Sequence, residues 1–202
     1  MIISHRYKFI FIKTSKTAGT SIEVLLSGLC GDDDIVTPIF PHVAPHRARN
    51  FEEKGFKNHM AANDISSRID SSIWRSYYKF CVERNPWDKV LSHFHMHRYR
   101  AEGRLTLEEY FEDGKLPEDF YKYTDSSGDL VVDRVVKYEN LETDLAEVFG
   151  YLGVPFCGKL NVRAKSEYRA DRRHYSEVLT SQQADVVAKA FEREIALFGY
   201  QF

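Results

Sequence analysis

The sequence contains little cysteine and no marked excess of charge of either sign. Its three cysteines, Cys30, Cys81 and Cys157, are odd in number, lie far apart and form no C-x-x-C pair. This pattern argues against a disulfide framework or a cysteine zinc site and indicates free thiols in a reducing compartment. The formal net charge of −2 lacks the basic excess of a general nucleic-acid-binding protein, so we expect no nucleic-acid partner.

Long apolar runs are also absent. No stretch approaches the roughly 18 residues of a membrane span, and the N-terminus has no charged-then-apolar signal segment. The sequence therefore predicts a cytoplasmic protein without a membrane partner. With 202 residues, of which 43% are apolar, the chain is long enough for one domain with a sizeable core and short for two. We expect residues 1–202 to form a single domain.

The most informative stretch that is present lies near the N-terminus. Four consecutive apolar residues, 9–12, predict a buried strand, and the apolar residues that follow a short polar loop recur at helical spacing: Ile22, Leu25, Leu26 and Leu29. A helix that begins after such a loop is suited to anion binding, because its N–H groups and the positive end of its dipole point at the ligand.

The composition of this loop supports an anion site. Lys16 adds a mobile positive charge beside Ala18 and Gly19, and three residues add hydroxyl donors: Thr17, Thr20 and Ser21. A capped helix beside a surface lysine is the alternative, but a cap needs only one hydroxyl, so the anion site is favoured. The loop is not the P-loop of nucleoside triphosphatases, because Lys16 precedes Gly19 and no upstream glycine opens the loop.

A second motif follows the predicted strand at residues 78–82. Asn85 is a good N-cap and Pro86 a good first residue for the next helix. Arg84 then lies at the C-terminal end of the strand, where its guanidinium can fork onto a phosphate, and Ser92 on the helix can donate a further hydrogen bond. The alternative is a structural ion pair and a solvent-facing serine. The occurrence of both motifs in this order favours phosphate binding.

Strands and helices alternate along the chain, which predicts an α/β fold with a mainly parallel central sheet and helices on both faces. Further helices are expected at 63–69, 86–102, 106–112 and 141–152, and a last one begins with a Thr180–Gln183 capping box. Residues 130–138 read as a strand, 32–34 as a solvated acidic turn and 35–60 as irregular. Ligands of such sheets bind beyond the C-terminal ends of the strands, where both motifs fall.

Five segments together resemble the carbohydrate-type sulfotransferases, the family that includes the heparan and chondroitin sulfotransferases: 16–21, 57–59, 84–92, 137–141 and 198–202. The resemblance implies 3′-phosphoadenosine-5′-phosphosulfate (PAPS) as co-substrate, a glycan or small-molecule acceptor with a hydroxyl group, and no metal. It also implies that residues 16–21 form a P-loop-like site for the 5′-phosphosulfate and that Arg84 and Ser92 bind the 3′-phosphate. Ser15 departs from the family, which commonly has proline there.

The resemblance further assigns catalytic roles. Lys16 is the candidate for stabilising charge on the bridging oxygen, and His59 matches the position of the base that accepts the hydroxyl proton. A histidine suits this task because its pKa lies near neutrality. His42 and His46 are weaker alternatives, with a possible part in acceptor binding. In the basic segment 161–173, Lys165 and Ser166 are expected to close over the adenosine and 3′-phosphate.

Other interpretations remain open from the sequence. His93 and His97 share a helix face and could hold zinc, but His95 points elsewhere and no third ligand is evident, so a solvated histidine face is favoured. A nucleotide kinase or phosphohydrolase would need magnesium and ATP or GTP, and the missing G-K-[ST] loop counts against it. A non-catalytic protein that binds adenosine phosphates or sulfated glycans is the third possibility.

Overall fold

The computed structural model describes residues 1–160, 162, 168–169 and 171–202. The chain divides into two compact units, Met1–Glu83 with Tyr121–Ala164 and Arg84–Phe120 with Lys165–Phe202. Each unit has a hydrophobic core cluster of its own. The assignment of residues 1–202 to a single domain stays a prediction. No helix in the described part of the chain is long and apolar enough to cross a membrane.

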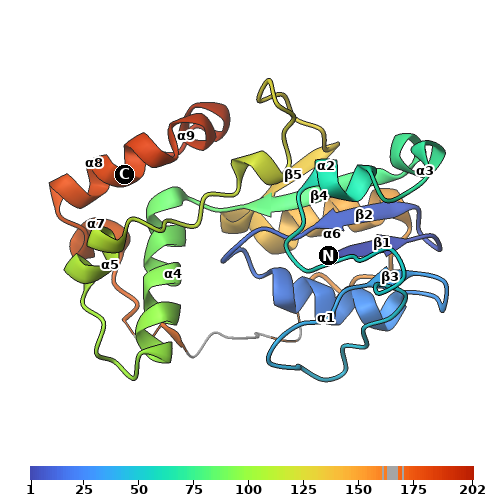
Figure 1. Ribbon diagram of the computed structural model, residues 1–202, viewed down its shortest axis with the longest axis horizontal. Coiled ribbons are helices and arrows are strands. Elements are labelled where there is room, and N and C mark those ends of the chain that lie inside the picture. Colours follow the sequence, from blue (N-terminus) through green and yellow to red (C-terminus); the bar gives the residue numbers. More distant parts are fainter. Residues whose placement is uncertain (161, 163–167, 170) are drawn as a thin grey trace. The chain divides into compact units, whose positions relative to one another are not determined.

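The first unit is built on a five-stranded sheet with the order β3-β1-β2-β4-β5 (Figure 1). The strands are β1 (Ile2–Ser4), β2 (Phe9–Ile12), β3 (Ile35–Val36), β4 (Tyr78–Glu83) and β5 (Arg134–Lys137). Neighbours β2, β4 and β5 run parallel, whereas β1 is antiparallel to both β2 and β3. The expected mainly parallel α/β sheet is therefore confirmed.

Helices cover both faces of this sheet. They are α1 (Gly19–Leu29), α2 (Ala62–Ser66), α3 (Ser71–Ser76) and α6 (Leu141–Leu152), with short 3₁₀ turns at Phe120–Lys122 and Tyr138–Asn140. One core cluster joins Ile22 of α1 and Phe149 of α6 to Phe80 of β4, so both helices pack on the same face. On the other face, the buried Lys79 donates through Nζ to the carbonyl oxygen of Trp74 in α3.

The second unit is helical. It contains α4 (Pro86–Arg100), α5 (Leu107–Asp113), α7 (Tyr175–Val178), α8 (Ser181–Ala190) and α9 (Glu192–Phe198). Trp87 anchors α4 to α8, because its indole nitrogen donates to the carbonyl oxygen of Ala184 at 3.0 Å. The predicted capping box of Thr180 and Gln183 is present at the start of α8.

Several boundaries differ from the sequence-based expectations. The strand expected at 130–138 shortens to β5, because Leu130 makes only an isolated bridge and Tyr138 begins a 3₁₀ turn. The last helix breaks at Phe191, whose φ of −109° ends α8 and begins α9. The strands β1 and β3 and the helices α3 and α7 were not expected from the sequence. The expectation that residues 35–60 are irregular is wrong at β3, which pairs with β1.

The acidic segment 32–34 was expected to be a solvated turn, which is wrong for Asp34. Its side chain is buried and accepts hydrogen bonds from the Ser4 hydroxyl and from the backbone N–H groups of His5, Arg6 and Gly31. Burial alone would raise the pKa of Asp34, but these hydrogen bonds outweigh it and hold the pKa below its ordinary value. Asp34 thus ties together the β1–β2 turn and the end of α1.

Candidate functional site

The loop between β2 and α1 has an unusual backbone. Lys16 and Ala18 adopt left-handed conformations, with φ values of 62° and 59°. Ala18 is the N-cap of α1, and its methyl group cannot accept a hydrogen bond from the first turn of the helix. Left-handed residues within a turn bring backbone N–H groups to one side, which is typical of concave anion sites. The expected strand–loop–helix unit is therefore present, with Lys16 half-buried within it.

Two threonines hold this loop against the sheet. The Thr14 hydroxyl donates to the carbonyl oxygen of Val82 in β4, and it lies 2.8 Å from the Thr17 hydroxyl. Thr17 is almost completely buried, and its hydroxyl serves these contacts inside the loop. We therefore expect Thr17 to present its backbone N–H, rather than its hydroxyl, to an anion.

A buried ion pair beneath the loop was missed by the sequence reasoning. Lys13, only 4% exposed, donates to the Thr20 hydroxyl at 3.2 Å and pairs with the fully buried Glu23, which also accepts from the Met1 nitrogen. Burial lowers the pKa of Lys13, and Glu23 opposes this shift. Because the Thr20 oxygen accepts from Lys13, its own hydrogen must be donated in another direction.

Gly19 has a packing role that the motif alone does not reveal. A Cβ atom at this position would lie 2.7 Å from Cγ of Lys13, closer than real Cβ contacts allow. The glycine therefore makes room for the buried lysine side chain where α1 begins. Its φ is not in the left-handed region, so the close approach is what requires glycine.

The candidate base His59 is exposed in the first unit. Its backbone is left-handed, with a φ of 61°, and its N–H donates to Oδ1 of Asn58 at 3.1 Å. Asn58 in turn donates to the carbonyl oxygen of Pro38. An exposed imidazole on an anchored backbone is accessible to an acceptor molecule.

The alternative bases differ in surroundings. His46 is only 2% exposed, and among the described residues its Nε2 is a buried nitrogen without a hydrogen-bond partner. Burial lowers the pKa of His46, which keeps its ring neutral. The ring of His42 contacts the carbonyl oxygen of His46 at 2.8 Å. Because His46 is enclosed, the exposed His59 is better placed than His46 to meet a substrate, whereas His42 is exposed as well.

The second group of candidate residues lies in the helical unit, at the start of α4. The Asn85 side chain accepts hydrogen bonds from the N–H groups of Trp87 and Asp88, and Pro86 is the first helical residue, as expected. Arg84 donates from Nε and Nη2 to Oδ2 of Asp88, at 2.9 and 2.5 Å. The structural ion pair considered as an alternative for Arg84 is therefore present.

A second arginine meets the same carboxylate. Nη1 of Arg169 donates to Oδ1 of Asp88, while its other nitrogens donate to the carbonyl oxygens of Asp171 and Arg173. Burial would raise the pKa of Asp88, but the charges and hydrogen bonds of Arg84 and Arg169 hold it low. From the sequence, Arg169 was recognised only as part of a basic segment. The two residues of that segment that were expected to bind the donor, Lys165 and Ser166, lie outside the described residues.

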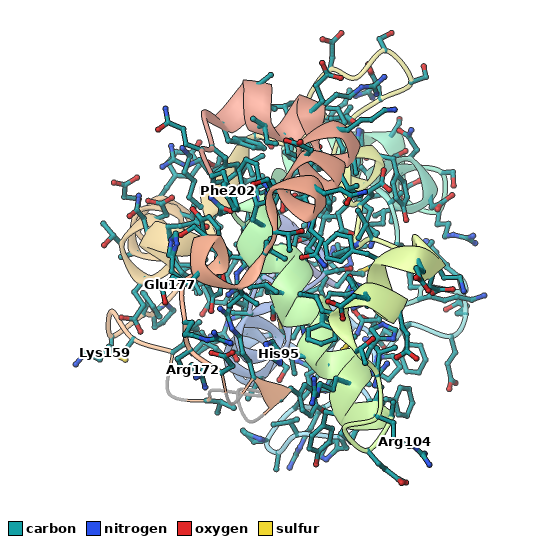
Figure 2. The ribbon with its side chains drawn as sticks, turned by 90° about the vertical axis from the view of Figure 1, so that its left-hand side faces the viewer. His95, Arg104, Lys159, Arg172, Glu177 and Phe202 are labelled. Atoms are coloured by element: carbon teal, nitrogen blue, oxygen red, sulfur yellow. The ribbon has the colours of Figure 1, made fainter. Side chains whose placement is uncertain are left out.

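Ser92 and His95 lie four and seven residues after Asp88, so all three share one face of α4. Figure 2 shows His95 close to Arg172, which belongs to the segment before α7. Burial lowers the pKa of His95, and the charges of Arg169, Arg98 and Arg172 lower it further. This face therefore combines a hydroxyl group with a local excess of positive charge, which suits a phosphate.

Comparison with known proteins defines the class. The chain belongs to the sulfotransferase family, whose sequence model matches residues 1–126. The matched part contains the loop with Lys16 and also His59, Arg84 and Ser92.

The chain is similar to one protein in sequence and to two solved structures in fold. An uncharacterized protein of Archaeoglobus fulgidus is 32% identical over 117 residues, which are 54% of this chain and 98% of the relative. The crystal structure of mouse sulfotransferase SULT7A1 complexed with PAP has the same fold, with a TM-score of 0.53, 13% identity and coverage of 96% of this chain and 86% of that chain. A sulfotransferase from Alicyclobacillus acidocaldarius has a TM-score of 0.47 and 15% identity, with coverage of 95% and 96%.

Proposed function

We propose that the protein transfers a sulfuryl group from PAPS to a hydroxyl group of a carbohydrate. The observation that carries this proposal is the loop between β2 and α1, in which Lys16 and Ala18 adopt left-handed backbones at the start of a helix. The loop falls within the part of the chain that matches the sulfotransferase family. The similar mouse enzyme was solved with PAP, the product that PAPS leaves after transfer, which supports PAPS as the donor.

In the proposed reaction, the acceptor oxygen attacks sulfur while the bond from sulfur to the bridging phosphate oxygen breaks. Positioning and charge stabilisation do most of the catalysis in such transfers. Lys16 stabilises the charge that develops on the leaving phosphate, and the first-turn N–H groups of α1 bind the other oxygens. His59 accepts the proton of the acceptor hydroxyl. PAP and a sulfate ester are the products, and the proposal uses no metal.

A separate set of residues is assigned to the 3′-phosphate of the donor. Arg84 and Ser92 bind the 3′-phosphate in this proposal, together with Lys165 and Ser166. Support comes from the spacing of the motif and from the positive charge around the Ser92 face of α4. Ser15 stands where the family commonly has proline, and this replacement removes no group that could bind the donor.

The carbohydrate acceptor is proposed from the resemblance of the motifs to the carbohydrate-type sulfotransferases. A panel of acceptors can decide between a glycan and a small alcohol: transfer of labelled sulfate from PAPS is measured to desulfated glycosaminoglycans, short saccharides and simple alcohols. Transfer only to the alcohols would contradict the carbohydrate assignment.

Single substitutions test the assigned roles. Lys16→Ala and His59→Ala should each lower turnover by about a hundredfold or more, the usual scale for such groups. Lys8→Ala is the matched control, because Lys8 is an exposed lysine that lies before the loop. If neither PAPS nor PAP binds at millimolar concentration, or if ATP hydrolysis with magnesium is found instead, the proposal is wrong. Tight binding of PAP without any transfer would indicate a non-catalytic binding protein.

A further inference from the structure

Two histidines one turn apart on α4 face each other. The Nε2 atoms of His93 and His97 lie 3.1 Å apart and share a hydrogen bond, and their ring centroids are separated by 4.3 Å. Both side chains are partly exposed. Metal–nitrogen bonds of about 2.0–2.1 Å at angles of about 90° to 109° place two neighbouring ligand nitrogens about 2.9 to 3.4 Å apart. The two rings therefore already have the spacing of adjacent ligands on one metal ion.

A third side chain orients one of these rings. Nδ1 of His93 lies 2.8 Å from the hydroxyl group of Tyr110 in α5. When Nδ1 donates its hydrogen to the Tyr110 oxygen, Nε2 carries the lone pair that a metal needs. Metal-binding histidines commonly use their second nitrogen in this way. Tyr110 is buried, so its hydroxyl group is held in place beside the His93 ring.

We propose that His93 and His97 bind a divalent transition-metal ion, with water completing its coordination. Imidazole ligands favour Zn²⁺, Ni²⁺ and Cu²⁺ over Mg²⁺ or Ca²⁺. Among the described residues, no group of three or more histidine, cysteine, aspartate or glutamate side chains could hold a metal. The site therefore supplies two protein ligands, both from α4, and this binding is independent of sulfuryl transfer. From the sequence a solvated histidine face was favoured, because His95 points elsewhere and no third ligand is evident.

Calorimetric titration of the tag-free protein with ZnCl₂ and NiCl₂ tests the site. His97→Asn removes one ligand and should weaken binding by about a hundredfold. Tyr110→Phe removes the group that orients His93 and should weaken binding by about tenfold, the usual scale for such partners. His95→Asn is the matched control, since His95 lies on the same helix outside the pair, and it should leave the affinity within about twofold. At one fixed concentration, Zn²⁺ should raise the melting temperature of the wild type and of this control by similar amounts, and that of the other two variants by less.

Three results would overturn the proposal. The first is an absence of Zn²⁺ and Ni²⁺ binding to the wild type at millimolar concentration. The second is unchanged affinity in a folded His97→Asn variant, which would assign binding to other residues. Where that variant fails to fold, Cu²⁺ electron paramagnetic resonance of the wild type replaces it. Coupling to two imidazole nitrogens supports the site, and coupling to fewer than two contradicts it.

Discussion

Lys13 and Lys16 are three residues apart, and the structure gives them different tasks. Lys13 is buried and paired with Glu23 beneath the loop, whereas Lys16 is half-buried within the loop itself. We therefore expect Lys13→Met to reduce stability and Lys16→Met to reduce donor binding and turnover. Methionine suits both positions, because it keeps most of the length of the side chain and removes only the charge.

The loss of stability expected for Lys13→Met follows from the burial of its partner Glu23. Removing one member of a buried ion pair costs about 3–5 kcal/mol, because the other charge stays buried without compensation. Glu23 still accepts from the Met1 nitrogen, so we expect the lower end, about 3 kcal/mol. In a chain of this size that loss lowers the melting temperature by roughly 6–12 °C. Adding Glu23→Gln removes the stranded charge and should recover about 2 kcal/mol.

Urea unfolding followed by circular dichroism measures both effects. The free energy of unfolding of Lys16→Met should stay within about 0.5 kcal/mol of the wild type, while calorimetry shows weaker PAP binding. The reasoning fails if Lys13→Met costs less than about 1 kcal/mol, or if the double variant is as unstable as the sum of the two single ones. Equal loss of stability in the two lysine variants would show that Lys16 is structural as well.

Three further predictions concern side chains with several partners. Asp34→Asn should destabilise the protein by about 2–3 kcal/mol at neutral pH, because four donors lose a charged acceptor. The folded-state pKa of Asp34 lies below its ordinary value of 3.8, so its stabilisation is lost as the pH falls. The difference between wild type and variant, measured by urea unfolding, should therefore shrink from about pH 5 towards pH 3. Asn85→Ala should cost about 1 kcal/mol through loss of the α4 cap, whereas an unchanged unfolding midpoint would contradict that role. Asp88→Asn should weaken PAP binding, because Asp88 orients Arg84, and tighter binding by calorimetry would show instead that Asp88 only competes with phosphate.

Local chemistry made much of the fold predictable. Buried parallel strands read as continuous apolar runs, so β2 was predicted at its observed bounds and β4 to within one residue. Asn85 and Pro86 fixed the start of α4, because capping depends on neighbouring backbone groups alone. The short strand β1 could not be recognised, since three residues carry too little periodicity.

The buried charges could not be predicted, because tertiary contacts decide them. Asp34 follows two other aspartates and looks solvated in the sequence. In the fold, however, its side chain is buried and accepts hydrogen bonds from residues such as Ser4. Lys13 adjoins the loop motif without belonging to it, and Glu23 reads as an ordinary helix residue. A charge is buried at acceptable cost only when the fold brings an opposite charge beside it. For Lys13 that opposite charge is Glu23, ten residues further along the chain.

The two interpretations of Arg84, phosphate ligand and structural ion pair, do not exclude each other. Asp88 accepts from Arg84 on one carboxylate oxygen and from Arg169 on the other, so one negative charge fixes the orientation of two positive ones. The cluster keeps a net charge of about +1 within the helical unit, and its guanidinium groups need not be ordered again when an anion binds. In the proposed function, the ion pair with Asp88 therefore also prepares the Arg84 guanidinium for a phosphate.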